Sequence, residues 1–216
     1  MIPWRLKNWF AERFPLIYHV AANFGLKQNS AEHWDAILEA TWSDEYRDWP
    51  TTNALVQGCI TKDALLLDIG CGTGGLLRHL RGAGFTRLHG LELSSYAVRR
   101  LLSEGICVHQ GKLPTLPFPA ASFDAVVLSQ VLEHVIRRHT LLKEIKRVLS
   151  ANGTCLVFVP DDCQGPIDEP EHVVKFNSES LRALLSKYFT VVRLETFRDS
   201  HHKMPYLFAH CVAGRP

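Results

Sequence analysis

The chain has 216 residues, of which 46% are hydrophobic and 21% are charged, and its 24 basic and 22 acidic residues give a formal net charge of +2. This composition is typical of a folded protein of one domain, or of one domain with a small appendage, and it excludes disorder, collagen-like repeats and coiled coils. Because a nucleic-acid-binding surface normally shows as a basic stripe, no nucleic-acid partner is expected.

The six cysteines show neither a C-x-x-C pair nor a spacing typical of a zinc site, so we expect buried thiols, a reducing compartment and no metal. No segment approaches the ~18 apolar residues that a transmembrane helix requires. Charged residues such as Arg5, Lys7 and Glu12 interrupt the N-terminal segment, where a signal peptide would need an apolar core. A cytoplasmic location is the expectation.

Residues 1–60 predict a helical extension. Apolar residues recur at helical spacing up to Phe14, a second helix is predicted to begin near Ser30, and a third is predicted to follow Pro50. Residues 4–14 mix tryptophan, phenylalanine and basic side chains. One hypothesis is therefore that this segment rests on a membrane surface.

Aromatic side chains are concentrated in the extension, because all five tryptophans lie within the first 49 residues. Two interpretations stay open. The aromatic residues either dock the helices onto the rest of the protein, or they form a lid that selects a substrate through Trp42, Tyr46 or Trp49.

After the extension, short apolar runs alternate with segments of helical pattern. The predicted strands are 64–70, 85–93, 106–110, 123–130, 153–160, 191–197 and 206–213, and the predicted helices are 74–83, 95–104, 137–149 and 178–187. Apolar strands alternating with helices indicate a parallel sheet covered on both faces. The turn between the last two strands is too short for a parallel crossover and predicts an antiparallel pair. The expected fold is α/β: a Rossmann-like, doubly wound, seven-stranded sheet with a reversed last strand. It would comprise an N-terminal helical cap over 1–60 and a cofactor-binding domain over 61–216.

The strongest motif is a strand that runs into a glycine-rich turn and then a helix, LLLDIGCGTGG over 65–75. Glycines let the backbone turn sharply and approach a ligand closely. The next strand ends at Glu92, where a carboxylate can accept hydrogen bonds from both hydroxyls of a ribose. Glycines 70, 72 and 75 also satisfy the G-x-G-x-x-G pattern of dinucleotide-binding proteins. Asp68 argues against a dinucleotide, because a carboxylate repels a pyrophosphate but suits a cofactor that carries an ammonium group.

LLLDIGCGTG followed by GLELS resembles motif I and the acidic second strand of class I S-adenosylmethionine-dependent methyltransferases. The similarity continues through FDAVVLSQVLEHV and RVLSANGTCLVFVP and covers about residues 60–213. The closest group contains ubiquinone/menaquinone, sugar and glycan methyltransferases. The resemblance implies S-adenosyl-L-methionine as the cofactor, and it implies a binding set of Asp68, Gly70, Cys71, Gly72, Gly74, Glu92, Leu93, Gly111, Lys112, Leu113, Ser129 and Gln130.

Lys112 departs from the family, which commonly has an aspartate that accepts a hydrogen bond from the adenine amino group. A charged lysine cannot accept a hydrogen bond. Either Gln110 or a backbone carbonyl takes that role, or the adenine is held by packing and by the amide of Leu113.

Catalytic candidates follow the fourth and fifth strands, where open α/β sheets bind ligands. His134 is the first candidate for a general base, because histidine titrates near neutral pH and related sugar methyltransferases use a histidine in this stretch. Its alternative role is to shape the start of a helix. Asp161 is the second candidate, although Asp161 and Asp162 could equally cap or turn the chain. His172 lies on the following loop and could cover the same opening.

The sequence therefore predicts methyl transfer to a small-molecule, glycan or lipid-linked acceptor, most readily at oxygen. The motifs of base-modifying DNA methyltransferases are absent, because SQVLEHV stands where those enzymes have an Asn/Asp-Pro-Pro-aromatic motif. The alternatives are a catalytically silent cofactor-binding module and a nicotinamide-dependent oxidoreductase. The adjacent His201 and His202 are expected to form a solvated turn, since two adjacent histidines alone are weak evidence for a metal site.

Overall fold

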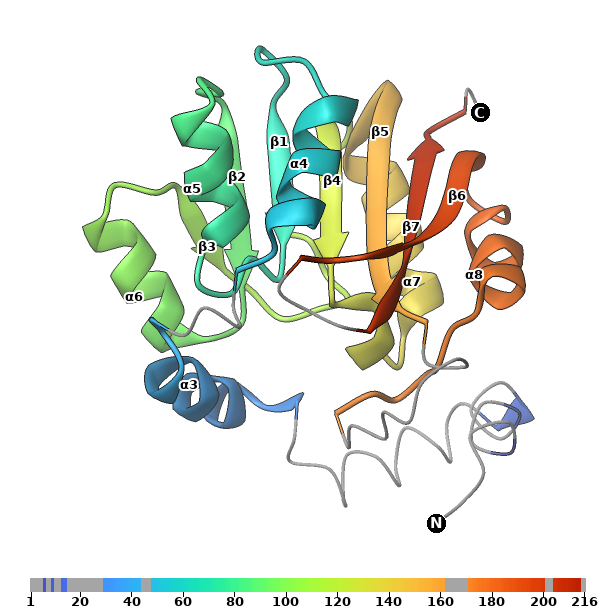
Figure 1. Cartoon of the computed structure of the whole chain (residues 1–216), viewed down its shortest axis with the longest axis horizontal. Helices are drawn as coiled ribbons and strands as arrows, with labels where there is room; N and C mark the ends of the chain where they lie inside the picture. Colours follow the sequence, from blue (N-terminus) through green and yellow to red (C-terminus); the bar gives the residue numbers. More distant parts are fainter. Residues whose placement is uncertain are drawn as a thin grey trace.

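The computed structural model describes residues 6, 9, 13, 14, 29–43, 48–161, 171–200 and 204–214. A seven-stranded sheet in the order β3-β2-β1-β4-β5-β7-β6 forms the centre of the molecule (Figure 1). Its strands are β1 (Leu66–Ile69), β2 (Leu88–Glu92), β3 (Val108–Gln110), β4 (Phe123–Ser129), β5 (Leu149–Pro160), β6 (Thr190–Arg198) and β7 (Pro205–Val212). The helices are α3 (Ala31–Ala40), α4 (Pro50–Cys59), α5 (Gly75–Gly82), α6 (Ser95–Ser103), α7 (Arg138–Val148) and α8 (Ser178–Leu185), with the 3-10 turn η3 (Leu132–His134).

Strands β1 to β5 pair in parallel, whereas β7 is antiparallel to both of its neighbours, β5 and β6. The predicted doubly wound sheet with a reversed last strand is therefore confirmed. The order of the strands in the sheet reverses between β1 and β4. Strands β2 and β3 follow one another on one side of β1, and β4 and β5 follow on its other side. In open α/β sheets a crevice opens at such a reversal, beyond the carboxyl ends of the strands.

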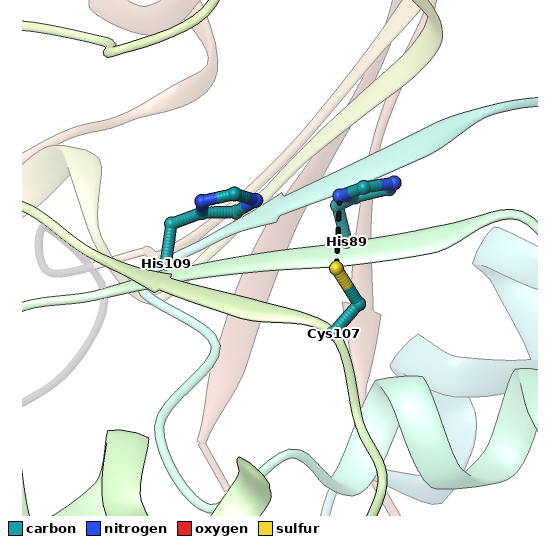
Figure 2. A group of neighbouring side chains, drawn as sticks. All are labelled: His89, Cys107 and His109. Carbon is teal, nitrogen blue, oxygen red and sulfur yellow. Dashed lines mark hydrogen bonds between the residues drawn. The ribbon is translucent and has the colours of Figure 1, made fainter.

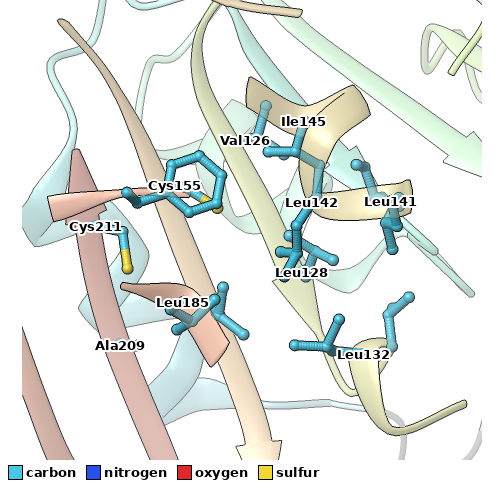
Figure 3. Packing of buried hydrophobic residues seen from close by; sticks show 14 of the residues in the cluster. Val126, Leu128, Leu132, Leu141, Leu142, Ile145, Cys155, Leu185, Ala209 and Cys211 are labelled. Atoms are coloured by element: carbon cyan, nitrogen blue, oxygen red, sulfur yellow. The ribbon is translucent and has the colours of Figure 1, made fainter. Parts of the chain in front are cut away.

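The core has two layers because consecutive strand residues point to opposite faces of the sheet. On one face Leu66 and Val127 belong to a buried cluster that includes side chains of α4, α5 and α6. On the other face Leu67 and Val126 belong to a cluster that includes side chains of α7 and α8. Figure 3 shows part of the second cluster, in which Leu142 and Ile145 of α7 lie close to Val126 and Leu128 of β4, and Leu185 of α8 lies on the side of Ala209 and Cys211 of β7.

The largest difference from a predicted boundary is at the start of β5. The helix expected over 137–149 ends at Val148, and β5 begins at Leu149 rather than at residue 153. Leu149 is aligned with Phe123 at the start of β4, with a register irregularity after this pair. The apolar pattern of the helix continues into Leu149, so the sequence alone did not mark the change from helix to strand.

The helices of the extension begin where predicted. Ser30 caps α3 by accepting a hydrogen bond from the His33 amide at 3.2 Å, and Pro50 opens α4. Asp35 fastens α3 to the start of α6, because its carboxylate accepts hydrogen bonds from the Ser94 and Ser95 hydroxyls and from the Tyr96 amide. In Figure 1, α3 lies below the sheet, at the end toward which β4 points. Most of the helix predicted within residues 4–14 falls outside the described residues.

Asp199, directly after β6, fastens α4. Its carboxylate Oδ2 accepts hydrogen bonds from the amides of Thr51 at 3.0 Å and Thr52 at 3.1 Å, which are the first free N–H groups of the helix.

In the part of the chain that the structure describes, no helix has both the length and the apolar character needed to cross a bilayer.

Candidate functional site

A cavity of about 740 Å³ opens beyond the carboxyl ends of β1, β2 and β4, under α3. This volume lies within the range of small-molecule sites. Every member of the predicted cofactor-binding set lines it except Gly74. The lining members are Asp68, Gly70, Cys71, Gly72, Glu92, Leu93, Gly111, Lys112, Leu113, Ser129 and Gln130.

Two glycines of the turn have different roles. Gly72 has a φ of +53°, and a side chain added there would meet nothing within 4 Å, so the backbone is exposed to open space in the cavity wall. Gly74 has a φ of +79°, and a Cβ there would lie 2.5 Å from Leu101 of α6. Gly74 therefore permits close packing at the start of α5 rather than close approach of a ligand, which explains its absence from the lining.

Glu92 joins the end of β2 to the glycine turn. Its carboxylate accepts hydrogen bonds from the amides of Gly72 at 2.8 Å, Leu93 at 2.7 Å and Ser94 at 2.9 Å. Burial raises the pKa of Glu92, while these three donors act in the opposite direction. The side chain thus holds the turn in place at the wall of the cavity.

Asp68 is buried on β1, with 3% of its surface exposed, and it lines the cavity. Burial, and then the neighbouring Glu92, raise the pKa of Asp68 to about 8. A carboxyl group in this setting is half protonated near pH 8 and becomes a carboxylate more easily when a positive charge arrives.

The end of β4 carries a strained residue. Gln130 has a φ of +56°, which is unusual for a residue other than glycine. Its backbone amide donates to the Phe158 carbonyl at 2.9 Å, while its buried side-chain Nε2 has no hydrogen-bond partner among the described residues. Such strain and an unpaired buried donor occur together at functional sites.

The loop after β3 supplies the opposite wall. Gly111 and Leu113 line the cavity, and Lys112 does so with an exposed side chain. Gln110, the suggested substitute for the family's aspartate, is also exposed, and its Nε2 lies 3.4 Å from the Leu93 carbonyl. Neither Lys112 nor Gln110 therefore offers a buried acceptor for the adenine amino group.

His134 lies on η3 and lines the far end of the cavity. Its Nδ1 is 3.1 Å from the Glu171 carbonyl. Since a carbonyl can only accept, Nδ1 carries the proton and Nε2 of the neutral ring is the acceptor. Burial, and then His172, lower the pKa of His134 to about 3, so the ring is neutral at physiological pH.

His172 is brought beside His134, because the amides of Val173 and Val174 both donate to the Glu133 carbonyl. The two imidazole centroids are 4.9 Å apart in an edge-to-face arrangement. His172 also lines the cavity, so the sequence interpretation that it covers the same opening is confirmed in position.

Asp161 does not line the cavity. It is buried, and its amide donates to the Pro205 carbonyl at 3.0 Å, so the sheet pairing of β5 with β7 continues through it. Asp161 therefore extends the sheet and lies away from the cavity, so its predicted catalytic role has no support in this position. Asp162, His201 and His202 lie outside the described residues.

Some aromatic residues of the extension line the cavity, as a lid would, and others only dock the helices onto the rest of the protein. Trp34 of α3 lines the cavity and contacts His134 edge to face with centroids 5.4 Å apart. Trp49 also lines it. Trp42 does not, because it packs against Tyr96 and lies under the Arg100 guanidinium at 4.9 Å. Tyr46 lies outside the described residues.

Several lining residues were not predicted. They are Asn29, Ser30, Trp34, Ile37, Leu38, Thr52, Asn53, Thr73, Gly75, Leu76, Leu91, Pro114, Val131, Val135, Ile136, Arg137, Pro160, Glu171, Val173 and Tyr206. Glu133, the sequence neighbour of the candidate base His134, also lines the cavity. Glu171 is the most informative, because its carbonyl also accepts from Asn29 and its carboxylate lies 3.2 Å from His33 Nε2. No local pattern marks it, since its partners are more than 35 residues away.

Comparison with known proteins agrees with this geometry. Residues 67–157, which run from β1 to β5, match the methyltransferase domain family. The chain is 30% identical over 182 residues to the sterol 24-C-methyltransferase erg-4 of Neurospora crassa, covering 72% of this chain and 46% of the relative. It is 35% identical over 114 residues to the fatty-acid O-methyltransferase of Mycolicibacterium smegmatis, covering 49% of this chain and 39% of the relative. The chain thus spans less than half the length of either relative.

Among solved structures, a SAM-dependent methyltransferase from Aquifex aeolicus has the same fold, with a TM-score of 0.67 and 14% identity over 83% of this chain and 98% of the other. The family match covers the strands that carry Asp68, Glu92 and Gln130, which line one cavity. The strand order, the cavity and the sequence match together show that residues 67–157 form a methyltransferase domain with the fold of the S-adenosylmethionine-dependent enzymes.

Proposed function

We propose that this protein transfers a methyl group from S-adenosylmethionine to an acidic oxygen of a small acceptor with an apolar body, such as a fatty acid, a phenol or a lipid-linked compound. The observation that carries the proposal is a single cavity that is lined both by the buried Asp68 and Glu92 and by a neutral histidine among aromatic and apolar side chains.

The residues present fit the cofactor. The buried Asp68 suits its ammonium group, and Glu92 lies at the end of β2 where a ribose is held in this family. The orphaned Gln130 Nε2 is a donor without a protein acceptor among the described residues, and the carboxylate of the cofactor would supply one. S-adenosylmethionine supplies a methyl group activated on a positively charged sulfur.

Positioning accounts for much of the catalysis, because holding two reactants in line replaces an encounter in solution. We assign the glycine turn, Glu92 and Gln130 to orienting the cofactor. We assign Trp34 and Trp49 to binding the apolar body of the acceptor, since both line the cavity. His134 Nε2 accepts the hydrogen bond, or the proton, of the attacking oxygen.

The low pKa of His134, about 3, narrows the acceptor class. An imidazole of that pKa holds a proton weakly, so it cannot deprotonate a sugar hydroxyl efficiently. A fatty acid is already ionised at physiological pH and needs no base, and a phenol gives up its proton more readily than a sugar hydroxyl. The sterol and fatty-acid methyltransferases that the chain resembles are named for acceptors with apolar bodies, which is consistent with this choice.

As part of the same proposal, residues 1–60 form a helical cap over a methyltransferase domain of residues 61–216, in the cytoplasm. The hydrogen bonds of Asp35 to the start of α6 support the cap, because they hold α3 over the cavity. Trp34 then reaches the acceptor end from an element that the family match does not include.

The test is methyl transfer from isotopically labelled S-adenosylmethionine to a panel of fatty acids, phenols, quinols and sugar glycosides, with products identified by mass spectrometry. We expect label in methyl esters or ethers of the apolar acids and phenols, and little in the glycosides. Label on carbon would overturn the oxygen assignment. Cofactor binding without transfer to any acceptor would instead support a silent module.

We also propose that the N-terminal segment contacts a membrane surface. Leu6, Trp9 and Phe14 expose 53%, 54% and 40% of their surfaces, and Trp9 and Phe14 contact each other edge to face. Exposed apolar side chains next to basic residues favour an anionic bilayer. The full chain should sediment with vesicles containing phosphatidylglycerol, and the double variant L6S/W9S should not. Equal sedimentation of the two proteins would disprove the proposal.

A further inference from the structure

A group of metal-ligand side chains lies on β2 and β3, outside the cavity. Figure 2 shows His89, Cys107 and His109 side by side, and their ligand atoms all lie within 4.8 Å of one another. The Cys107 Sγ is 3.3 Å from His89 Nδ1, and the two imidazole rings are nearly parallel, with centroids 5.8 Å apart. None of the three lines the cavity.

The register of the two strands brings these residues together. Gly90 pairs with Val108 and Leu91 pairs with His109, so His89 lies opposite Cys107. Because alternate residues of a strand share a face, all three side chains project from the same side of the sheet. Cys107 and His109 are exposed and His89 is half-buried. Among the described cysteines, only Cys107 is exposed.

We propose that His89, Cys107 and His109 bind a zinc ion through two imidazole nitrogens and one thiolate. These are the ligand types that zinc prefers, and for tetrahedral bonds of normal length the sulfur and nitrogen lie roughly 3.5 Å apart. The observed separation of 3.3 Å is close to that value. Three protein ligands leave a fourth position for water. Binding converts the Cys107 thiol to a thiolate and releases its proton to solvent.

Aromatic side chains form one wall of the zinc site. Phe123 contacts His89 with ring centroids 5.9 Å apart, and Phe118 contacts His109 with centroids 5.0 Å apart. Phe118 and Phe123 also contact each other edge to face. These contacts restrict the two imidazoles, so little side-chain freedom remains to be lost when an ion binds.

The ion would cross-link the edge of the sheet beside the cofactor. Strand β3 has only three residues and no neighbour on its outer side in the described sheet. His109 precedes Gly111 of the cavity wall by two residues, and His89 precedes Glu92 by three. Zinc is therefore expected to stabilise the edge strand, independently of methyl transfer.

The test uses the full chain, freed of metal with a chelator and titrated with Co²⁺ and then Zn²⁺. We expect one equivalent of Co²⁺ to give a thiolate-to-cobalt absorption band that Zn²⁺ abolishes. The band should be absent in C107S, and H89N and H109N should bind at least about 100-fold more weakly, because losing even an outer-shell partner costs 10–100-fold. C59S and H79N are matched controls, since Cys59 and His79 lie on α4 and α5.

Two results would overturn the assignment. One is a cobalt–thiolate band that persists in C107S. The other is loss of metal binding in H172N with binding retained in C107S, because Glu133, His134 and His172 form another group with ligand spacing. Alkylation by iodoacetamide gives a measurement without variants. Saturating Zn²⁺ should slow alkylation of Cys107 but not of Cys59, and an unchanged rate at Cys107 would contradict the proposal.

Discussion

Replacing Asp68 with asparagine is expected to remove most of the affinity for S-adenosylmethionine while raising the thermal stability of the free protein. Asp68 is buried at the cavity wall and its pKa is about 8, because burial and Glu92 both oppose its ionisation. An amide keeps the shape of the side chain but provides no charge for the ammonium group. Isothermal titration calorimetry and a thermal melt of both proteins measure the two effects.

The affinity for S-adenosylmethionine should depend on pH in a way that identifies Asp68 as the group that binds the ammonium. Below pH 8 a proton competes with the cofactor for Asp68, so the affinity of the unmodified protein should fall roughly tenfold for each pH unit between 7.5 and 6. The heat of binding should also depend on the buffer, since a proton is released. D68N should show neither effect. Cofactor affinity in D68N that equals the original and varies with pH in the same way would contradict the assignment.

The stability effect follows from the same pKa. In the unfolded chain this carboxyl has a pKa near 3.9, so between about pH 4 and pH 8 the folded state binds the proton more tightly. Stability is therefore lost as the pH rises through that window, by up to about 4 kcal/mol at pH 7. D68N removes this penalty, and its melting temperature should exceed that of the original protein at pH 7 but not at pH 4. D63N is the control, because Asp63 is exposed in the turn before β1.

The fold and the cofactor end of the cavity could be predicted from the sequence because the signals there are local. Asp68 and Gly72 belong to one run of eleven residues, and Glu92 ends the next strand. Apolar strands buried on both faces have a composition that distinguishes them from the helices between them. The topology then follows from the short connection between β6 and β7, which only an antiparallel pair permits.

The acceptor end could not be predicted in the same way, because its contacts join distant segments. Trp34 meets His134, and Asn29 shares the Glu171 carbonyl with His134. Gly74 shows the opposite error, since the family motif suggested a ligand contact where the structure has packing against Leu101. The residues of the proposed zinc site were not singled out from the sequence for a similar reason. His89 lies 18 residues before Cys107, and only the strand register makes them neighbours.

Replacing His134 with asparagine is expected to lower kcat with a phenol acceptor by roughly tenfold, the cost of one lost hydrogen bond, and to leave cofactor affinity almost unchanged. The ring lines the end of the cavity away from Asp68's strand, on η3, and its Nε2 is the acceptor because Nδ1 donates to Glu171. Single-turnover kinetics with a phenol acceptor, together with calorimetry of cofactor binding, separate transfer from binding.

The pH profile distinguishes a role at the reacting oxygen from a general loss of activity. Since the pKa of His134 is about 3, its titration should produce no inflection of kcat between pH 5 and pH 8. A bell-shaped profile with an acid limb near pH 6.5 that disappears in H134N would contradict the buried, neutral state of the ring. The unfolded-state pKa is near 6.5, so this burial costs stability progressively as the pH falls from 6.5 toward 3. H134N should therefore lose less stability on acidification than the original protein.

H33N is the matched control for the loop that carries Glu171. His33 contacts the Glu171 carboxylate at 3.2 Å but does not line the cavity, so its replacement disturbs the same residue without touching the acceptor. We expect H33N to lose only a small fraction of the activity that H134N loses. Equal losses in the two variants would mean that His134 acts only by holding Glu171. Full activity in H134N would remove it from the mechanism, and positioning by Trp34 and the glycine turn would then account for the transfer.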